Sequence, residues 1–371
     1  MKYKSIRLGD YIERSTKNNK DERYGTELIV GVSNEGVFTS PKGNPEGVDL
    51  KPYKIVNDGA FVYNPSRLDL GSIAYRTEGM CIVSHLYIVF YLNDEGKKII
   101  DPTYLFMYFR RQEFYREVRF RNFGSQRPEF NFNDMSEIIM PLPPLPVQQK
   151  YVAIYKAMIA NQQSYERGLE NLKLVCDAYI DQLKSKCPLI TIGHFITQTD
   201  NRNTTNSPYH FKGLSMENYF IDSIANDVEL DFTKYKIVEP NDLACVLMKV
   251  GRDCRLTVAK NDSNETYIIS PAYYTFTLHN INPEYFMVNV NRFEFERRAW
   301  FFCDSSARGS LSWTAFCNLE IPDASTEEQR IVACLQIAYK KRFNINERLK
   351  AQIKDLCPIL VKGAVEEGEK T

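Results

Sequence analysis

The chain has 371 residues, and its 47 lysines and arginines are balanced by 47 aspartates and glutamates, with 43% hydrophobic residues. This composition is typical of a globular protein and excludes collagen-like, low-complexity and wholly disordered chains. No run approaches the ~18 apolar residues of a membrane helix, and the first seven residues lack the apolar core of a signal peptide, so we expect a cytoplasmic protein.

Residues 1–146 have the pattern of a mixed α/β (α+β) domain. Short strand-like runs such as 60–63 and 86–91 alternate with turns rich in Asn, Gly and Pro, and a helical stretch begins near Pro102. A proline cluster at 141–146 ends the domain, because proline lacks an amide donor and has a fixed φ.

Residues 147–186 are predicted to form one long helix. Apolar residues recur there at alternating steps of four and three, with a single polar interruption at Gln162. The predicted seam includes Tyr151, Tyr155, Met158, Leu169, Leu172 and Leu183.

The second half of the chain repeats the first. Tyr53-Lys54-Ile55-Val56 returns unchanged as Tyr235-Lys236-Ile237-Val238. Six such matches keep their order, with offsets from 180 (Gln149 to Gln329) to 186 (Ile82 to Ile268). We infer a tandem duplication, with a second domain at 187–326 and a second long helix at 327–371.

The second helix starts with a capping box, Ser325-x-x-Glu328, which satisfies first-turn amides. Its predicted seam includes Ile331, Leu335, Ile345, Leu349 and Leu356. Because an isolated amphipathic helix must bury its seam, we expect the two helices to form an antiparallel coiled coil in a pseudo-twofold molecule. The first seam would span about 50 Å, long enough to separate two readers of DNA half-sites.

No enzyme signature emerges from the sequence. The chain has no phosphate-binding G-x-x-x-x-G-K-[ST] loop, no G-x-G turn and no G-x-S-x-G elbow. The nine cysteines form no C-x-x-C pair and the four histidines lie far apart, so we expect no metal site. Asn64-Pro65 resembles the Asn-Pro loop of amino-methyltransferases, which leaves a methyltransferase-like enzyme as an alternative. A stand-alone coiled-coil scaffold is another.

Two segments are locally basic although the net charge is zero. Residues 110–127 hold six arginines against two glutamates, a charge of +4, interleaved with aromatics. Residues 249–260 hold four cations against one aspartate, a charge of +3. Arginine forks bind phosphates and guanine edges, so these segments favour DNA binding, with a solvated helix face as the simpler interpretation.

The order of domain, proline-rich stop, Gln-Gln-Lys helix, domain and Glu-Gln-Arg helix resembles the DNA-specificity (S) subunit of type I restriction-modification systems. The resemblance covers the whole chain and is carried by residues 139–150, which run from Ile-Met-Pro-Leu-Pro-Pro to Gln-Gln-Lys, and by the Gly-Ser-Gln-Arg turn at 124–127. The second copy departs from the pattern, since residues 321–330 lack the proline cluster.

The resemblance implies two target-recognition domains that read the halves of an interrupted DNA sequence, with the helices acting as a ruler. It implies docking of two methyltransferase subunits and an ATP-dependent restriction subunit, no cofactor, and no catalysis by this chain alone. The expected DNA contacts are Arg67, Arg76, Gln126 and Arg127 in the first copy and Lys249, Arg252, Arg255, Arg308 and Ser310 in the second.

Overall fold

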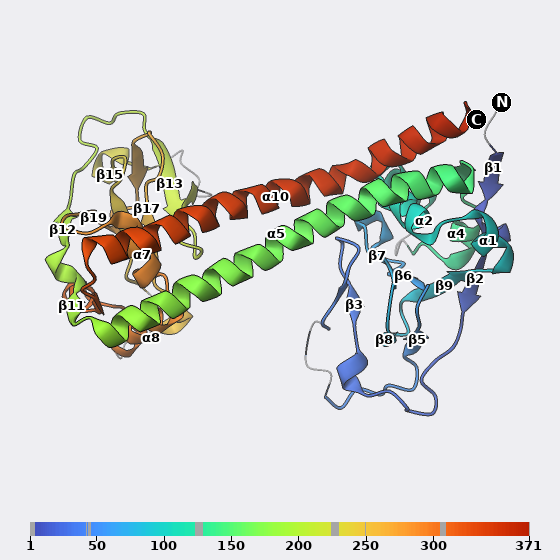
Figure 1. The fold of residues 1–371 in the computed structure, drawn as a ribbon, viewed down its shortest axis with the longest axis horizontal. Coiled ribbons are helices and arrows are strands. Elements are labelled where there is room, and N and C mark those ends of the chain that lie inside the picture. The colour runs from blue at the N-terminus through green and yellow to red at the C-terminus, as the bar shows by residue number, and fades with distance from the viewer. Residues whose placement is uncertain are drawn as a thin grey trace. The chain divides into compact units, whose positions relative to one another are not determined.

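The computed structural model describes residues 4–41, 43, 46–122, 129–223, 230–248, 250–304 and 309–370. The chain divides into two compact units, one of residues 1–164 with 346–371 and the other of residues 165–345. Each unit holds one half of the tandem repeat together with parts of two long helices, α5 (Leu145–Lys186) and α10 (Thr326–Gly368), drawn in green and red in Figure 1.

The first unit is a mixed α+β domain. An antiparallel sheet in the order β2-β9-β6-β7 lies at its centre, and β5–β8, β3–β4 and β1–β10 form two-stranded sheets. The strands are β1 (Lys4–Arg7), β2 (Ile12–Ser15), β3 (Gly31–Val32), β4 (Phe38–Thr39), β5 (Lys54–Val56), β6 (Phe61–Tyr63), β7 (Ile73–Tyr75), β8 (Cys81–Val83), β9 (Ile88–Leu92) and β10 (Ile139–Leu142). The helices are α1 (Asp94–Ile99), α2 (Pro102–Phe109), α3 (Gln112–Arg121), α4 (Phe132–Ser136) and a 3₁₀ turn η3 (Leu68–Leu70).

The second unit has the same plan. Its sheets run β12-β19-β16-β17, β14-β13-β18-β15 and β11-β20. The strands are β11 (Leu189–Thr191), β12 (Ile196–Thr199), β13 (His210–Leu214), β14 (Phe220–Asp222), β15 (Lys236–Val238), β16 (Leu243–Val246), β17 (Thr257–Lys260), β18 (Tyr267–Ile269), β19 (Tyr274–Leu278) and β20 (Glu320–Pro322). The helices are α6 (Val250–Asp253), α7 (Pro283–Val290), α8 (Phe293–Phe301) and α9 (Trp313–Cys317).

The repeated sequences occupy equivalent places in the two units. The repeated Lys-Ile-Val forms β5 and β15. β5 pairs antiparallel with β8, and β15 pairs antiparallel with β18; Ile82 of β8 and Ile268 of β18 belong to another of the sequence matches. Ile55 lies opposite Ile82, and Ile237 lies opposite Ile268, in the same register. The duplication read from the sequence is therefore a duplication of structure.

Local sequence fixes where the helices begin. Pro102 and Pro283 open α2 and α7, where the missing amide costs nothing. The side chains of Asp101 and Asn282 each accept two first-turn N–H groups. The Ser325–Glu328 capping box predicted for α10 is present, with the Ser325 N–H donating to the Glu328 carboxylate at 2.9 Å.

The hydrophobic core of each unit joins the domain to the long helices. In the first unit, Phe61 and Phe90 of the sheet pack in one cluster with Leu360 and Ala364 of α10. In the second, Phe276 and Phe286 share a cluster with Ile180 and Leu183 of α5. Each domain therefore packs on the long helix of the other copy: the first domain packs on α10, and the second packs on α5.

The two long helices run antiparallel within each unit. In the first unit the Lys150 Nζ lies 2.8 Å from a Glu367 carboxylate oxygen, and the Gln162 amide donates to Asn346 Oδ1 at 3.1 Å. Residue numbers thus rise along α5 as they fall along α10. In the second unit Cys176 of α5 shares a core cluster with Val332 of α10, which is the same direction.

The seam predicted for α5 is the protected side of that helix. Leu169 and Leu183 are buried, and Tyr151, Tyr155, Met158 and Leu172 are half-buried. In α10, the predicted positions Leu335, Leu349 and Leu356 are also half-buried.

Ile331 and Ile345 correct the predicted seam of α10. These side chains remain 39% and 40% exposed, and their neighbours Val332 and Asn346 are buried instead. A slip of one residue rotates a helical position by about 100°, which moves a side chain off the seam. The sequence match pairs Gln149 with Gln329, whereas the adjacent Gln148 is the residue equivalent to Gln329. The predicted positions Ile331 and Ile345 in α10 are therefore shifted by one residue.

The hydrogen bonds establish that equivalence. The Gln148 side chain accepts the Asp101 N–H at 2.9 Å, and the Gln329 side chain accepts the Asn282 N–H at the same distance. The true offset is therefore 181 rather than 180.

Candidate nucleic-acid interface

Two loops meet in the same way in both units. In the first unit the Pro65 carbonyl, after β6, accepts a hydrogen bond at 3.0 Å from the Phe130 N–H, before α4. In the second, the Leu247 carbonyl, after β16, accepts one at 2.9 Å from the Leu311 N–H, before α9. The partners differ by 182 and 181 positions, so the bonds are equivalent. Of the predicted DNA contacts, Arg67, Arg252 and Ser310 lie in these paired loops.

Arg67 stands at the exposed start of η3 in the first unit. Its guanidinium has no hydrogen-bond or ion-pair partner among the described residues. The turn behind it is fixed, because Gly71 has a φ of +97° and its carbonyl accepts a hydrogen bond from Arg110 Nη1 at 2.6 Å. An immobilised turn that presents an uncommitted cation is suited to a phosphate contact.

Two glycines bring the paired loops of the second unit together. The Gly251 N–H donates to the Gly309 carbonyl at 2.8 Å, and Gly309 has a φ of +56°. A Cβ on Gly251 would lie 3.3 Å from the Gly309 Cα, and one on Gly309 would lie 2.9 Å from the Arg252 nitrogen. The close approach therefore requires glycine at position 309.

Arg252 and Ser310 lie on either side of that contact. Arg252 is exposed and its Nε lies 2.8 Å from Asp253 Oδ1. Ser310 is fixed through its backbone, which donates to Asp304 Oδ1 at 3.1 Å and accepts the Asp304 N–H at 3.0 Å. The exposed ion pair is weak in water, so the Arg252 guanidinium remains able to exchange its partner for a phosphate.

Arg255 has a different environment. Its Nη1 lies 3.2 Å from the carboxylate of Glu296, a residue of α8 that is only 2% exposed. A buried carboxylate needs a cation, so the structure commits Arg255 to Glu296.

Arg76 lies apart from Arg67. Because β7 runs antiparallel to β6, with Ile73 opposite Tyr63 and Tyr75 opposite Phe61, Arg76 follows the other end of the sheet. Its Nε donates to the Gly79 carbonyl at 3.1 Å and its guanidinium lies over the Phe38 ring. The structure thus brings Arg67 and the 129–131 segment together and leaves Arg76 elsewhere. Gln126, Arg127, Lys249 and Arg308 lie outside the described residues.

The helices that precede the second loop of each pair expose an aromatic residue at the same place. Phe120 near the end of α3 and Phe301 at the end of α8 are each 83% exposed, and they differ by the offset of 181. Neither residue was among the DNA contacts expected from the sequence. The correct offset would have aligned them and shown that each falls opposite the core-facing side of its helix.

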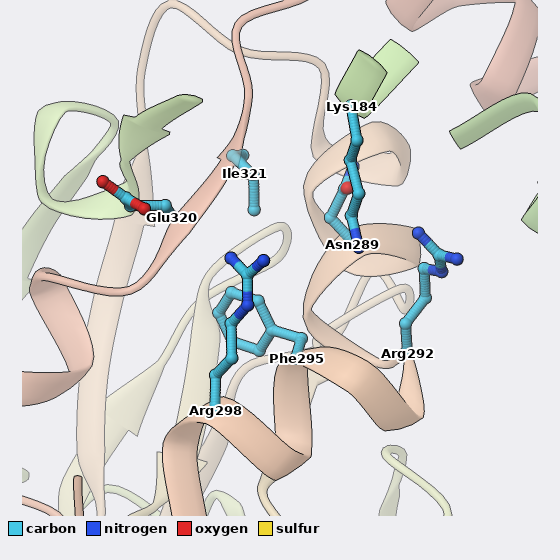
Figure 2. A pocket seen from close by; sticks show the side chains of 7 residues that line it. All are labelled: Lys184, Asn289, Arg292, Phe295, Arg298, Glu320 and Ile321. Atoms are coloured by element: carbon cyan, nitrogen blue, oxygen red, sulfur yellow. The ribbon is translucent and has the colours of Figure 1, made fainter. Parts of the chain in front are cut away.

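A small pocket in the second unit lies where α8 meets α5, and Figure 2 shows the side chains of Lys184, Arg292 and Arg298 around it. Their charges are compensated: Lys184 and Arg298 pair with Glu294, and Arg292 pairs with Asp177 at 3.3 Å. The hydrogen bond from Lys184 lowers the pKa of the Glu294 carboxyl. We interpret the cluster as an electrostatic attachment of α8 to α5.

Asn64, the residue that suggested a methyltransferase loop, has a structural role in this fold. Its Oδ1 accepts the Ser66 N–H at 3.0 Å, which is an Asx turn leading into the Arg67 loop. Within the described ranges, no group of three His, Cys, Asp or Glu side chains is placed to hold a metal ion. No helix in those ranges is long and apolar enough to span a bilayer.

Residues 2–173 match the family described as "Type I restriction modification DNA specificity domain". No curated protein matches the chain.

Several solved structures are similar over nearly the whole chain. The S subunit of a type I restriction-modification system from M. genitalium has 11% identity and a TM-score of 0.57, with 98% of this chain and 96% of that chain covered. The HsdS subunit from Thermoanaerobacter tengcongensis has 15% identity, a TM-score of 0.41 and coverages of 98% and 96%. A chain from work on "complex assembly and conformational transition of the type I R-M system" has 17% identity, a TM-score of 0.48 and coverages of 98% and 97%.

The fold is that of a tandem α+β protein in which two similar domains pack on a pair of long helices. Residues 2–173 are thus similar to type I restriction-modification DNA specificity domains, and the chain shares its fold with the M. genitalium subunit.

Proposed function

We propose that the chain reads a bipartite, interrupted DNA target through two target-recognition domains, residues 1–146 and 187–326. The observation that supports this most directly is the pair of equivalent loop contacts, Phe130 to Pro65 and Leu311 to Leu247. The same scaffold thus carries different side chains in its two copies, Arg67 in one and Arg252 in the other. A repeated frame with diverged loops is what two different half-sites require.

The helical segments, residues 147–186 and 327–371, are proposed to act as the ruler between half-sites and as the docking platform for two methyltransferase subunits. In the second unit the long helices expose Leu174 and Val175 of α5 and Ile331, Ile337 and Ile345 of α10, each at least 39% accessible. Glu327, Arg330, Ile331, Cys334 and Leu335 of α10 line a surface pocket. Exposed apolar patches with a polar rim are typical of protein interfaces.

In this proposal the chain is a non-catalytic subunit without a cofactor, and methylation and ATP-dependent cleavage belong to its partners. The lone Asn64 candidate for catalysis is engaged in its own turn, which supports that division of labour. The chain supplies sequence recognition and places the methyltransferase subunits over their target adenines.

The test is methylation-sensitive sequencing of DNA from cells that carry the chain with its methyltransferase subunits. We expect one motif made of two short half-sites and a fixed gap. Each variant affects only its own half-site. Arg67→Ala should therefore reduce methylation most at sites whose remaining contacts are weakest. Arg252→Ala should also reduce methylation, with a different dependence on flanking sequence. A single uninterrupted motif, or methylation that does not require this chain, would refute the proposal.

A further inference from the structure

The outward faces of α3 and α8 carry exposed side chains at matching positions. On α8 these are Phe293, Arg297, Trp300 and Phe301, which recur at i, i+4, i+7 and i+8 and therefore share one side of the helix. Phe293, Trp300 and Phe301 are 76%, 48% and 83% exposed, and the opposite side, with Phe295 and Ala299, is buried. Three large aromatic side chains on a nine-residue helix are thus exposed to solvent, and packing in the core does not account for them.

The corresponding face of α3 shares two of these features. Arg116 is equivalent to Arg297 and Phe120 to Phe301, whereas Gln112 and Arg119 replace Phe293 and Trp300. The shared positions thus place an arginine in the middle of the face and an exposed phenylalanine at its end. The two variable positions are polar or cationic in one copy and aromatic in the other.

Both faces adjoin the loops described above. In the second unit α8 packs under the α6 turn through the Arg255–Glu296 pair, and a Cβ on Gly251 would lie 3.1 Å from the Cβ of Cys303, just after α8. In the first unit a Cβ on Gly71 would lie 3.1 Å from the Tyr115 hydroxyl of α3. Trp300 lies one helical turn after Glu296 on α8, and Arg119 lies one turn after Tyr115 on α3. Each exposed face therefore continues the surface that carries Arg252 or Arg67.

The charge of these faces identifies the occupant. Arg297 has no hydrogen-bond or ion-pair partner in the part of the chain that the structure describes, and Arg116 pairs only with the exposed Glu113, at 3.2 Å. The exposed cations with no strong partner suit a polyanion, and the aromatic rings suit the thymine methyl groups and base edges between its phosphates. Nine residues of helix extend about 13 Å, the length of about four base pairs, and the major groove admits a helix.

We propose that the outward faces of α3 and α8 contact the DNA major groove, with Arg116 and Arg297 on the phosphates and Phe120 and Phe301 against base edges. The aromatic positions Phe293 and Trp300 make the α8 face the more apolar reader, which favours a half-site that presents thymine methyl groups to it. This inference rests on the proposed function, because it assigns further specificity residues to the same DNA-reading domains.

The test uses the full chain and a fluorescent duplex that carries both half-sites of the methylated motif, with matched duplexes in which one half-site is scrambled. Phe301→Ala should weaken binding to the intact duplex about tenfold. It should change little on the duplex whose second-copy half-site is scrambled, because the lost contact is absent there. Phe120→Ala is the matched control and should show the opposite dependence.

Arg297→Ala tests the phosphate contact separately. It should weaken binding to all duplexes and lower the slope of log affinity against log salt by about one. The melting temperatures of all variants should equal that of the wild type, because the side chains are exposed.

The outcomes separate the two proposals. If the wild-type chain, with its partners, shows no preference for the intact duplex, the proposed function fails. If the wild type discriminates but Phe301→Ala and Arg297→Ala bind with unchanged affinity and salt slope, the assignment of the helix faces is overturned. Unchanged DNA binding with loss of a methyltransferase subunit from the purified complex would also overturn it, because the face would then be a protein interface.

Discussion

Arg255 illustrates how a residue chosen for its charge can belong to the fold. In sequence it is one of four cations in a basic segment, and nothing nearby in the chain reveals Glu296, which lies 41 positions away. Glu296 is buried at the position where the first copy has Tyr115, so the second copy acquired an internal carboxylate that needs a cation. The ion pair attaches the loop that carries Arg252 to α8.

Arg255→Ala should therefore lower the stability of the second unit. Removing the cation leaves the Glu296 carboxylate buried without that partner, and we expect a loss of about 2 kcal/mol in the free energy of unfolding, measured by urea denaturation. The control is Arg252→Ala, an exposed neighbour whose loss should change stability by less than about 0.5 kcal/mol. Full stability of Arg255→Ala together with loss of DNA affinity would instead make Arg255 a direct DNA contact.

At the scale of an element, Gln162 of α5 and Asn346 of α10 form a buried polar pair between the two long helices. The apolar clusters of the two units include the ends of the helices, from Val147 to Tyr155 and from Cys176 to Leu183 on α5. Between these stretches the buried residues of α5 are Gln162 and Leu169, so the middle of the seam is thinly packed. A buried polar pair favours the register in which the two amides meet.

Gln162→Leu should destabilise the helix pair in the first unit. The substitution removes the hydrogen bond that the Gln162 amide donates to Asn346, a residue that is 2% exposed, at a cost of about 1–3 kcal/mol in the free energy of unfolding. The adjacent Gln163 is exposed, so Gln163→Leu is a matched control with little expected effect. The double variant Gln162→Leu with Asn346→Leu should recover most of the loss, and a double variant no more stable than the single one would show that the amide pair is not the cause.

The helices and the duplication could be predicted from sequence because both depend on patterns that persist over many residues. Two predicted positions of the α10 seam, Ile331 and Ile345, lie one residue before the buried ones. At position 345 the pattern favoured the apolar Ile345 over the polar Asn346, because a pattern of hydrophobicity cannot represent a buried amide that is satisfied across the seam. The paired loops could not be predicted either. In the first unit the loops are joined by a hydrogen bond between backbone atoms of Pro65 and Phe130, and the side chains of these residues give no sign of this contact in the sequence.

At the scale of the whole molecule, the two copies retain backbone connections and diverge in exposed side chains. The helix caps of α2 and α7, the Gln148 and Gln329 bonds and the loop-joining bonds are all retained at an offset of 181 or 182. On the exposed faces of α3 and α8, Arg116 and Phe120 are retained as Arg297 and Phe301, whereas Gln112 and Arg119 are replaced by Phe293 and Trp300. Retention of the bonds on which the fold depends, with change at some exposed positions, supports the proposal that one scaffold reads two half-sites.

Lengthening both long helices tests the ruler directly. Seven residues inserted after Gln163 in α5, with seven inserted after Ile345 in α10, preserve the heptad seam and add about 10 Å of helix. If the helices set the gap between half-sites, the methylated motif should keep its half-sites and gain about three base pairs of spacer, read by methylation-sensitive sequencing. Insertion in α5 alone is the control and should abolish methylation, because α5 would then be seven residues longer than α10 and the two helices could not keep their register on both sides of the insertion. An unchanged spacer in the double insertion would show that the helices do not measure the DNA.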